Sequence, residues 1–272
     1  MSVGITCFGF ENPIADMAGH SRPQNRLTYS ARGNSEGAIR NEKTAVQIPF
    51  QFSEQRLFSI GGAYHRMTLR EGLVLPGTER EVPSRLENAE VNFSATQKLE
   101  SNETLGARFF VGSSSDRPFD GAATTSLKAL AFWSFPSEST PSDRWILSLN
   151  YSNNNSFTTL PIPGFAYLST RPGLTLVYGL PFAYVRWRPQ EEGPWTFSGF
   201  YLLTTLKLEA TYGPPYLNTF LRFDWGQESW MRSDREDTED RLTYDEKKLA
   251  VGGRAPLAPW LLIEAESGFA FE

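Results

Sequence analysis

The stretch Asn88-Ala89-Glu90-Val91-Asn92-Phe93-Ser94-Ala95 carries an apolar or small side chain at every second position and a polar side chain at the positions between. Successive side chains of a β-strand point to opposite faces of the sheet, so this alternation predicts a strand with one apolar and one polar face. Similar segments follow along the chain, for example Leu105 to Val111 and Trp145 to Tyr151. Helical periodicity is nearly missing, and we therefore expect an all-β fold.

Length and composition fit one large β domain. The chain has 272 residues, and β-sandwiches and β-barrels often run past about 200 residues as one unit. No linker divides the chain, so we predict a single domain over residues 1–272. Charged residues make up 21% and the formal net charge is -5, which favours neither a nucleic-acid-binding protein nor a disordered chain.

Apolar runs in the chain are shorter than the roughly 18 residues that a membrane-spanning helix needs. A membrane crossing would therefore use strands, because only helices and closed barrels satisfy their backbone hydrogen bonds in lipid. The alternation leaves two alternatives, a soluble sandwich and a transmembrane barrel. In the sandwich the apolar face forms a core, whereas in the barrel it meets lipid and the polar face lines a lumen.

Two features favour the barrel. Several alternating segments match the ~9–11 residues of a tilted membrane strand rather than the ~5–6 of an average globular strand. Tryptophans begin or end the apolar segments, as in the aromatic girdles of membrane barrels. The predicted interface aromatics are Trp145, Trp187, Trp195, Trp225 and Trp260. We predict an antiparallel outer-membrane β-barrel of meander topology with about 12 strands, within a range of roughly 10–14.

The strand count depends on how four segments are interpreted. Two weak N-terminal segments, Val3 to Phe10 and Leu27 to Ala31, are not counted. Leu174 to Tyr184 is taken as one strand, because it has the longest apolar alternation in the chain. Between Trp195 and Thr211 the apolar phase changes, and we explain the change by a β-bulge near Thr204.

Long and short connections alternate between the predicted strands, as in barrels with tight turns on one side. The longer connections are residues 70–85, 113–121, 153–160 and 227–245. A last strand that ends in the periplasm would put the short turn at Ala255 to Ala258 outside and the long loops inside, which is a conflict. Pro49 and Pro181 are a second difficulty, because a proline within a strand removes a ladder hydrogen bond unless it lies at a bulge.

One part of the chain has a resemblance to a known family. The segment Leu160-Pro161-Ile162-Pro163-Gly164-Phe165-Ala166-Tyr167, followed by Leu174-Thr175-Leu176-Val177-Tyr178-Gly179-Leu180-Pro181-Phe182, resembles a bacterial outer-membrane barrel family of unknown function. Members of that family often end in an aromatic-rich strand similar to Gly268-Phe269-Ala270-Phe271. The match is specific over Leu160 to Trp187. It implies a barrel and the bacterial outer membrane, and it implies no activity.

The polar faces of the predicted strands carry charges of both signs. The predicted lumen-facing residues are Glu90, Arg108, Lys128, Arg222, Asp224, Glu264 and Glu266. Mixed signs permit salt bridges across a small lumen, which would narrow or fill it. Leu130 and Phe132 also bring apolar side chains to this face of their strand.

Three functions follow as alternatives. We expect a structural or partner-binding barrel of an envelope assembly, which contacts the lipid bilayer and lipopolysaccharide and has other envelope proteins as candidate partners. A narrow porin-like channel for small solutes is the first alternative, and an outer-membrane hydrolase of lipids or peptides is the second. The N-terminus has no basic segment followed by an apolar run, so we expect a mature form without its signal peptide.

Catalytic signatures are missing from the sequence. It has no GxSxG, HExxH, Walker loop or Cys/His ligand set, so we predict no catalytic residue, no metal, no cofactor and no nucleic-acid partner. The histidines are His20 and His65, and a hydrolase would have to use a lumen-facing His65 with serine and asparagine partners. Cys7 is the one cysteine and has no disulfide partner in the chain. The charged loop Arg232 to Arg241 lacks the spacing of a calcium loop.

Overall fold

A computed structural model describes residues 3–6, 26–33, 39–75, 80–140, 142–154, 160–214, 216–235, 237, 240–258 and 261–271. These residues form sixteen β-strands and one short 3-10 helix, η1 (Ala122–Thr124). The strands are β1 (Val3–Thr6), β2 (Arg26–Gly33), β3 (Ile39–Ser53), β4 (Arg56–Leu69), β5 (Arg85–Lys98), β6 (Thr104–Ser115), β7 (Thr125–Pro136), β8 (Arg144–Ser152), β9 (Ile162–Arg171), β10 (Leu174–Leu180), β11 (Phe182–Trp187), β12 (Trp195–Leu202), β13 (Thr205–Tyr212), β14 (Asn218–Met231), β15 (Arg241–Ala258) and β16 (Leu261–Phe271).

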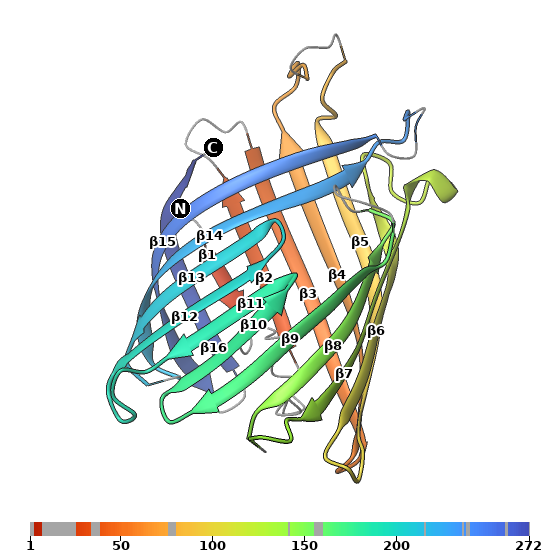
Figure 1. The fold of residues 1–272 in the computed structure, drawn as a ribbon. Coiled ribbons are helices and arrows are strands. Elements are labelled where there is room, and N and C mark those ends of the chain that lie inside the picture. The colour runs from red at the N-terminus through yellow and green to blue at the C-terminus, as the bar shows by residue number, and fades with distance from the viewer. Residues whose placement is uncertain are drawn as a thin grey trace.

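The strands form one sheet in which each strand lies beside its neighbours in the sequence and pairs with them antiparallel. β1 also lies against β16, so the sheet closes on itself (Figure 1). A closed sheet brings its first and last strands together, which is how a β-barrel satisfies its backbone hydrogen bonds. The prediction of an all-β barrel is therefore confirmed.

The prediction of about 12 strands is wrong. The two weak N-terminal segments that the count omitted are β1 and β2. Leu174 to Tyr184 is not one strand, because the chain turns at Pro181 and returns as β11 beside β10. The bulge expected near Thr204 is a hairpin turn between β12 and β13, in which Leu203 has a positive φ of 48°.

Both prolines avoid a central position in the ladder. Pro181 lies between two strands, and Pro49 lies in β3 beyond Gln47, the last residue of β3 that pairs with β2. A proline has no backbone N–H to donate, and neither proline lies where its strand is paired with a neighbouring strand on both sides.

The meander has an additional pairing that the sequence did not predict. β14 leaves β13 after Gly226 and continues to Met231, which pairs in parallel with Ser115 of β6. In Figure 1, β14 and β15 cross the barrel diagonally toward β5 and β6. Because Met231 pairs with Ser115, nine of the described strands, β14 to β16 and β1 to β6, form a closed ring at the end of the barrel where β14 and β6 meet. β7 to β13 complete the wall at the other end of the barrel.

The connections divide the barrel into two different ends. The long connections between β4 and β5, β6 and β7, β8 and β9, and β14 and β15 lie at one end, here called the long-loop end. The short turns that follow β3, β5, β9 and β13 lie at the other, here called the short-turn end. Both chain ends lie at the long-loop end (Figure 1). The end of the last strand and the long connections are therefore on the same side of the barrel, as the spacing of the predicted strands also implied.

Candidate functional site: the barrel interior

The pairing register shows which residues face the interior. Glu90, between outward-facing Ala89 and Val91, lies opposite Ala63 and Gly112 on the inner face. The other predicted lumen-facing residues also lie on inner-face rows of the register: Arg108, Lys128, Arg222, Asp224, Glu264 and Glu266. Six of the seven belong to two groups of paired charges, Arg222, Asp224, Glu264 and Glu266 in the first and Glu90 and Lys128 in the second.

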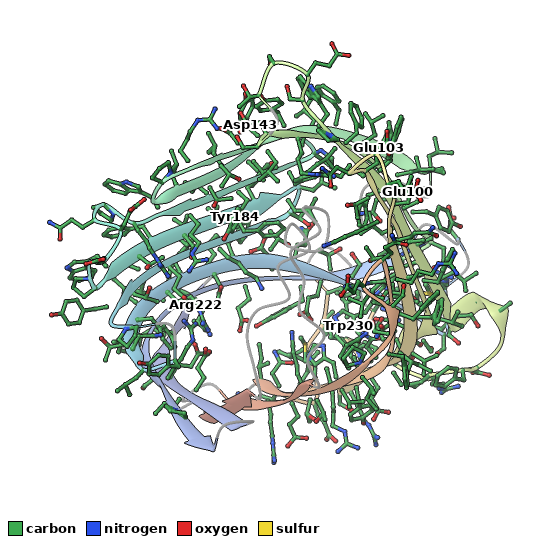
Figure 2. All side chains as sticks on the ribbon, turned by 90° about the horizontal axis from the view of Figure 1, so that it is seen from below. Glu100, Glu103, Asp143, Tyr184, Arg222 and Trp230 are labelled. Carbon is green, nitrogen blue, oxygen red and sulfur yellow. The ribbon has the colours of Figure 1, made fainter. Side chains whose placement is uncertain are left out.

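The first group is an ion-pair network on β13 to β16. Arg222 contacts three carboxylates, with N–O distances of 2.7 Å to Glu209, 2.9 Å to Glu264 and 3.0 Å to Glu266. Arg254 lies 2.7 Å from Glu209 and 2.6 Å from Glu264. The side chain of Arg222 is only 7% exposed (Figure 2 shows it on the inner side of the ring). A buried guanidinium with several carboxylates is stabilised as a set, because each charge is compensated within it.

Two further contacts extend this network. Lys248 forms ion pairs with Glu266 and, at 3.5 Å, with Asp224. The ring of Phe220 lies under both guanidinium groups, 4.4 Å from that of Arg222 and 4.6 Å from that of Arg254. The aromatic face therefore fixes the two arginines in a stacked arrangement, as cation–π contacts do.

The second group lies on β3 to β7 and β14. Lys128 pairs with Glu90 at 2.8 Å, and Lys43 pairs with Glu228. His65 Nε2 lies 2.5 Å from Asn41 Oδ1, and His65 Nδ1 lies 3.4 Å from a Glu228 oxygen. Both ring nitrogens of His65 thus have partners other than serine.

The inner face of β7 to β12 carries an apolar cluster. Phe132, Ile146, Leu168, Val177 and Phe182 form a cluster in which each side chain is at most 9% exposed. Leu130, Tyr184, Phe200 and Leu202 pack against it. Phe132 lies across Gly106, where an added Cβ would come within 2.2 Å of the ring. This part of the wall therefore has apolar side chains on both faces, as Leu130 and Phe132 had suggested.

A second apolar cluster lies inside the nine-strand ring near the long-loop end. Met67, Leu86 and Trp230 are 0–1% exposed, and Ile39, Leu69, Leu242 and Tyr244 pack against them. These residues come from β3, β4, β5, β14 and β15, and Figure 2 places Trp230 inside the ring. We call this cluster the apolar plug.

One layer of residues below the plug, the interior opens into a polar chamber of about 470 Å³. Its lining comes from β3, β4, β5, β6, β7, β14, the β8–β9 connection and the β12–β13 turn, and it includes Lys43, His65, Asn88, Lys128, Asn154 and Glu228. The register places Lys43, His65, Asn88 and Ser114 side by side on four consecutive strands. The chamber lies next to the apolar plug, because Trp230 of the plug is part of its lining.

The outer wall carries the predicted aromatics that the structure describes. Trp145, Trp187 and Trp195 lie near the short-turn end, at the start of β8, the end of β11 and the start of β12. They contact other aromatic rings there, for example Trp145 with Tyr167 at 4.5 Å and Trp195 with Tyr212 at 5.0 Å between centroids. Trp225 faces outward on β14. Trp260, like Cys7 and His20, lies outside the described residues.

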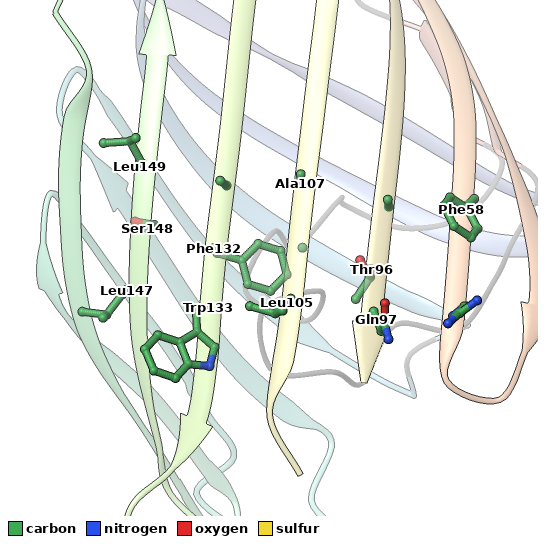
Figure 3. A pocket seen from close by; sticks show the side chains of 14 residues that line it. Phe58, Thr96, Gln97, Leu105, Ala107, Phe132, Trp133, Leu147, Ser148 and Leu149 are labelled. Atoms are coloured by element: carbon green, nitrogen blue, oxygen red, sulfur yellow. The ribbon is translucent and has the colours of Figure 1, made fainter. Parts of the chain in front are cut away.

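The outer wall also has a shallow groove of about 710 Å³ (Figure 3). Ala95, Ala107 and Ala131 lie side by side on β5, β6 and β7, and the larger Leu105, Trp133 and Leu149 border them. The groove exists because three small side chains lie in one row of an otherwise bulky surface.

Asp143 joins two turns at the short-turn end. Its carboxylate accepts two hydrogen bonds from Arg171, at 2.5 and 2.8 Å, and one from the Tyr167 hydroxyl at 3.0 Å. The Arg171 guanidinium, with help from the Thr170 amide and Tyr167, holds the pKa of the Asp143 carboxyl far below its usual range. The turn before β8 is thereby tied to the end of β9.

Among the described residues, no group of three or more His, Cys, Asp or Glu side chains could hold a metal ion. The described part of the chain also has no helix that is long and apolar enough to cross a membrane.

Sequence reasoning missed several members of the two polar groups. Glu209 lies between the apolar residues Leu208 and Ala210, so local alternation places it on the polar face of its strand. It was missed because the β12–β13 hairpin changes the phase of the alternation, and the change was interpreted as a bulge within one strand. Lys43, Lys248, Arg254 and Glu228 join the groups through pairings with distant strands, which a single sequence does not reveal.

Comparisons with known proteins add little to this description. No family model matches the sequence. No curated protein matches it either. Among solved structures, the chain is similar to a chain in the structure of the FpvAI–pyocin S2 complex, at 9% sequence identity and a TM-score of 0.36. The match covers 99% of this chain and 54% of that chain, so this chain spans about half of its length.

Proposed function

We propose that the protein is an outer-membrane β-barrel with a closed interior, which serves as a structural or partner-binding component of the bacterial envelope. The observation that carries the proposal is the apolar outer face of the barrel. Ile48, Ile60, Phe93 and Phe109 lie next to one another across β3 to β6, and each is 42–54% exposed.

The apolar outer face continues around the barrel. Outward-facing residues on the other strands include Leu149, Phe165, Tyr178, Leu208, Leu221 and Val251, each at least 46% exposed. Monomeric soluble proteins rarely expose apolar patches larger than a few hundred Å². A lipid bilayer would cover this surface, with the tryptophans of the short-turn end at one membrane interface. Lipid and lipopolysaccharide are therefore the first expected partners.

The closed interior favours a structural or partner-binding role over a porin-like channel. The apolar plug lies inside the described part of the nine-strand ring, and the ion-pair network occupies the inner face of β13 to β16. Charges that neutralise one another across a lumen narrow it. No arrangement of the described side chains favours hydrolysis over either of these functions.

Membrane insertion is tested with two neighbouring substitutions on β5. Val91 faces outward and is 62% exposed, whereas Asn92 faces inward. In a bilayer, Val91→Arg should cost about 2–4 kcal/mol of folding free energy, because an arginine near the midplane is placed in lipid. Asn92→Arg is the matched control and should cost less than half as much. The measurement is urea unfolding in phospholipid vesicles, with the compact migration of the unheated barrel on a gel as the folded signal.

Equal costs for the two variants would argue against a lipid-facing outer wall, as would a wild-type barrel that stays soluble and monomeric without detergent. Channel activity is tested separately by conductance across a planar bilayer. The closed interior predicts an electrically silent barrel. Steady single-channel steps in a properly folded preparation would support the porin-like alternative.

A further inference from the structure

We propose that the polar chamber below the apolar plug is a binding site for a neutral, hydroxyl-bearing solute of about monosaccharide size. The inference goes beyond the proposed function and does not depend on it, because the chamber is formed by side chains inside the ring. Its volume of about 470 Å³ lies within the range of about 300–1,000 Å³ that is typical of ligand pockets.

The space is created by small residues next to polar ones. Ala45 and Ala63 lie opposite one another on β3 and β4 and line the chamber. Gly226 faces inward on β14 just before the part that crosses to β6, and a Cβ added there would meet no atom within 4 Å.

The charged groups around the chamber are already matched. Lys43 pairs with Glu228, and Lys128 pairs with Glu90 at 2.8 Å. His65 lies between Asn41 and Glu228. In the described part of the chain, each of the two ammonium groups is paired to a carboxylate, so the charges of the chamber are balanced. The chemistry therefore favours a neutral ligand.

Three neutral hydrogen-bonding atoms of the chamber wall remain open. Asn88 Oδ1, Asn154 Oδ1 and the indole Nε1 of Trp230 are buried and have no hydrogen-bond partner in the described part of the chain. The orientation of Asn154 is set by its Nδ2, which donates to the Ser229 carbonyl at 2.8 Å. An acceptor or donor left open in a buried site costs free energy, which a ligand can recover by completing the bond.

A hydroxyl group matches this set best. It can donate to an amide oxygen and accept from an N–H with the same oxygen atom. A sugar-sized polyol presents several hydroxyls within a few ångströms of one another. Two amide oxygens and one indole N–H on the wall of one chamber can therefore be satisfied by a single molecule.

The test is isothermal titration calorimetry with D-glucose and N-acetyl-D-glucosamine as probes. The folded barrel is kept in an amine-oxide detergent, because a sugar-based detergent would compete for the site. We expect saturable binding of at least one neutral probe. Glucuronate and glucosamine, the anionic and cationic analogues, should bind at least tenfold more weakly.

Four leucine substitutions, one of them a control, locate the binding. Asn88→Leu and Asn154→Leu each remove an open amide oxygen, and each should weaken binding at least tenfold. Asn92→Leu is the matched control, since Asn92 faces inward on β5 but does not line the chamber, and it should change binding less than twofold. Ala63→Leu keeps every polar group and reduces the space, so it should also weaken binding at least tenfold.

Heat-modifiable migration shows for each variant that the barrel is folded. Absence of saturable binding by both neutral probes to the folded wild type would overturn the proposal. So would tighter binding of a charged analogue, or binding that Asn154→Leu and Ala63→Leu leave unchanged. None of these results bears on membrane insertion, which the Val91 and Asn92 arginine variants test.

Discussion

The inner faces of two parts of the wall are closed in different ways. On β13 to β16, Arg222, Arg254 and Lys248 are compensated by four carboxylates in a buried network. On β7 to β12, Phe132, Ile146 and Val177 pack with their neighbours as an apolar core. The outer faces of both parts are apolar. The difference therefore lies only in the side chains that point inward, and it shows that one sheet can fill its lumen by charge pairing or by packing.

The two solutions respond differently to a lost partner. A buried charge whose partner is removed keeps its desolvation cost without its compensation. A packed apolar residue loses transfer free energy and leaves a cavity. The following substitutions test the comparison, beginning with the largest expected effect.

Arg222→Met should have the largest effect, a loss of about 3–5 kcal/mol in the free energy of unfolding. The substitution keeps the volume but leaves Glu209, Glu264 and Glu266 with fewer cations nearby. Urea unfolding followed by tryptophan fluorescence measures it. Arg186→Met on the exposed part of β11 is the control and should change stability by less than about 0.5 kcal/mol. Equal effects of the two would show that the network does not stabilise the fold.

Ile146→Ala should cost about 2–5 kcal/mol, because this side chain is fully buried in the apolar cluster on the inner face. Its neighbour Leu147 faces outward and is 37% exposed, so Leu147→Ala is the matched control and should cost less than about 1 kcal/mol. The same unfolding measurement applies. A larger loss at Leu147 than at Ile146 would contradict the assignment of the packed face to the interior.

Asp143→Asn should cost about 1–3 kcal/mol at neutral pH, because hydrogen bonds to a charged group are lost at the short-turn end. The pKa of the Asp143 carboxyl is lowered in the folded state, so its stabilisation is complete above the unfolded-state pKa of about 3.9 and declines as the pH falls below it. The difference between wild type and variant should therefore shrink below about pH 4. A difference that is constant from pH 7 to pH 3 would rule out the charge as its source.

Ser233→Ala should have the smallest effect, about 0.5–1.5 kcal/mol, confined to the border between the two parts of the wall. The Ser233 hydroxyl donates to Asp116 at 2.8 Å and its amide donates to the same carboxylate at 2.7 Å, which holds the β14–β15 hairpin on the connection after β6. Hydrogen exchange of residues 227–235 should become faster, while Ser267→Ala on the exposed face of β16 leaves it unchanged. Unchanged exchange in Ser233→Ala would mean that backbone pairing alone holds the crossing.

The amino-acid sequence by itself determined the β class, the faces of most strands and the direction of the predicted lumen residues. The reason is local: the pleat of a strand sends successive side chains to opposite faces, so alternation such as that around Glu90 and Val91 is visible without any partner strand. Long connections and end-placed tryptophans were visible for the same reason. The outer membrane remains a prediction that the proposed experiments test.

Only the tertiary structure decided the number of strands, the register and the closure. A turn at Pro181 or at Leu203 preserves alternation on both sides, so a hairpin reads as one strand or as a bulge until its two halves pair. Arg222 meets Glu264 and Glu266 because β14, β15 and β16 align at a particular register, and Met231 reaches Ser115, 116 positions earlier in the sequence, for the same kind of reason. These contacts depend on how distant segments pair, which local alternation does not encode.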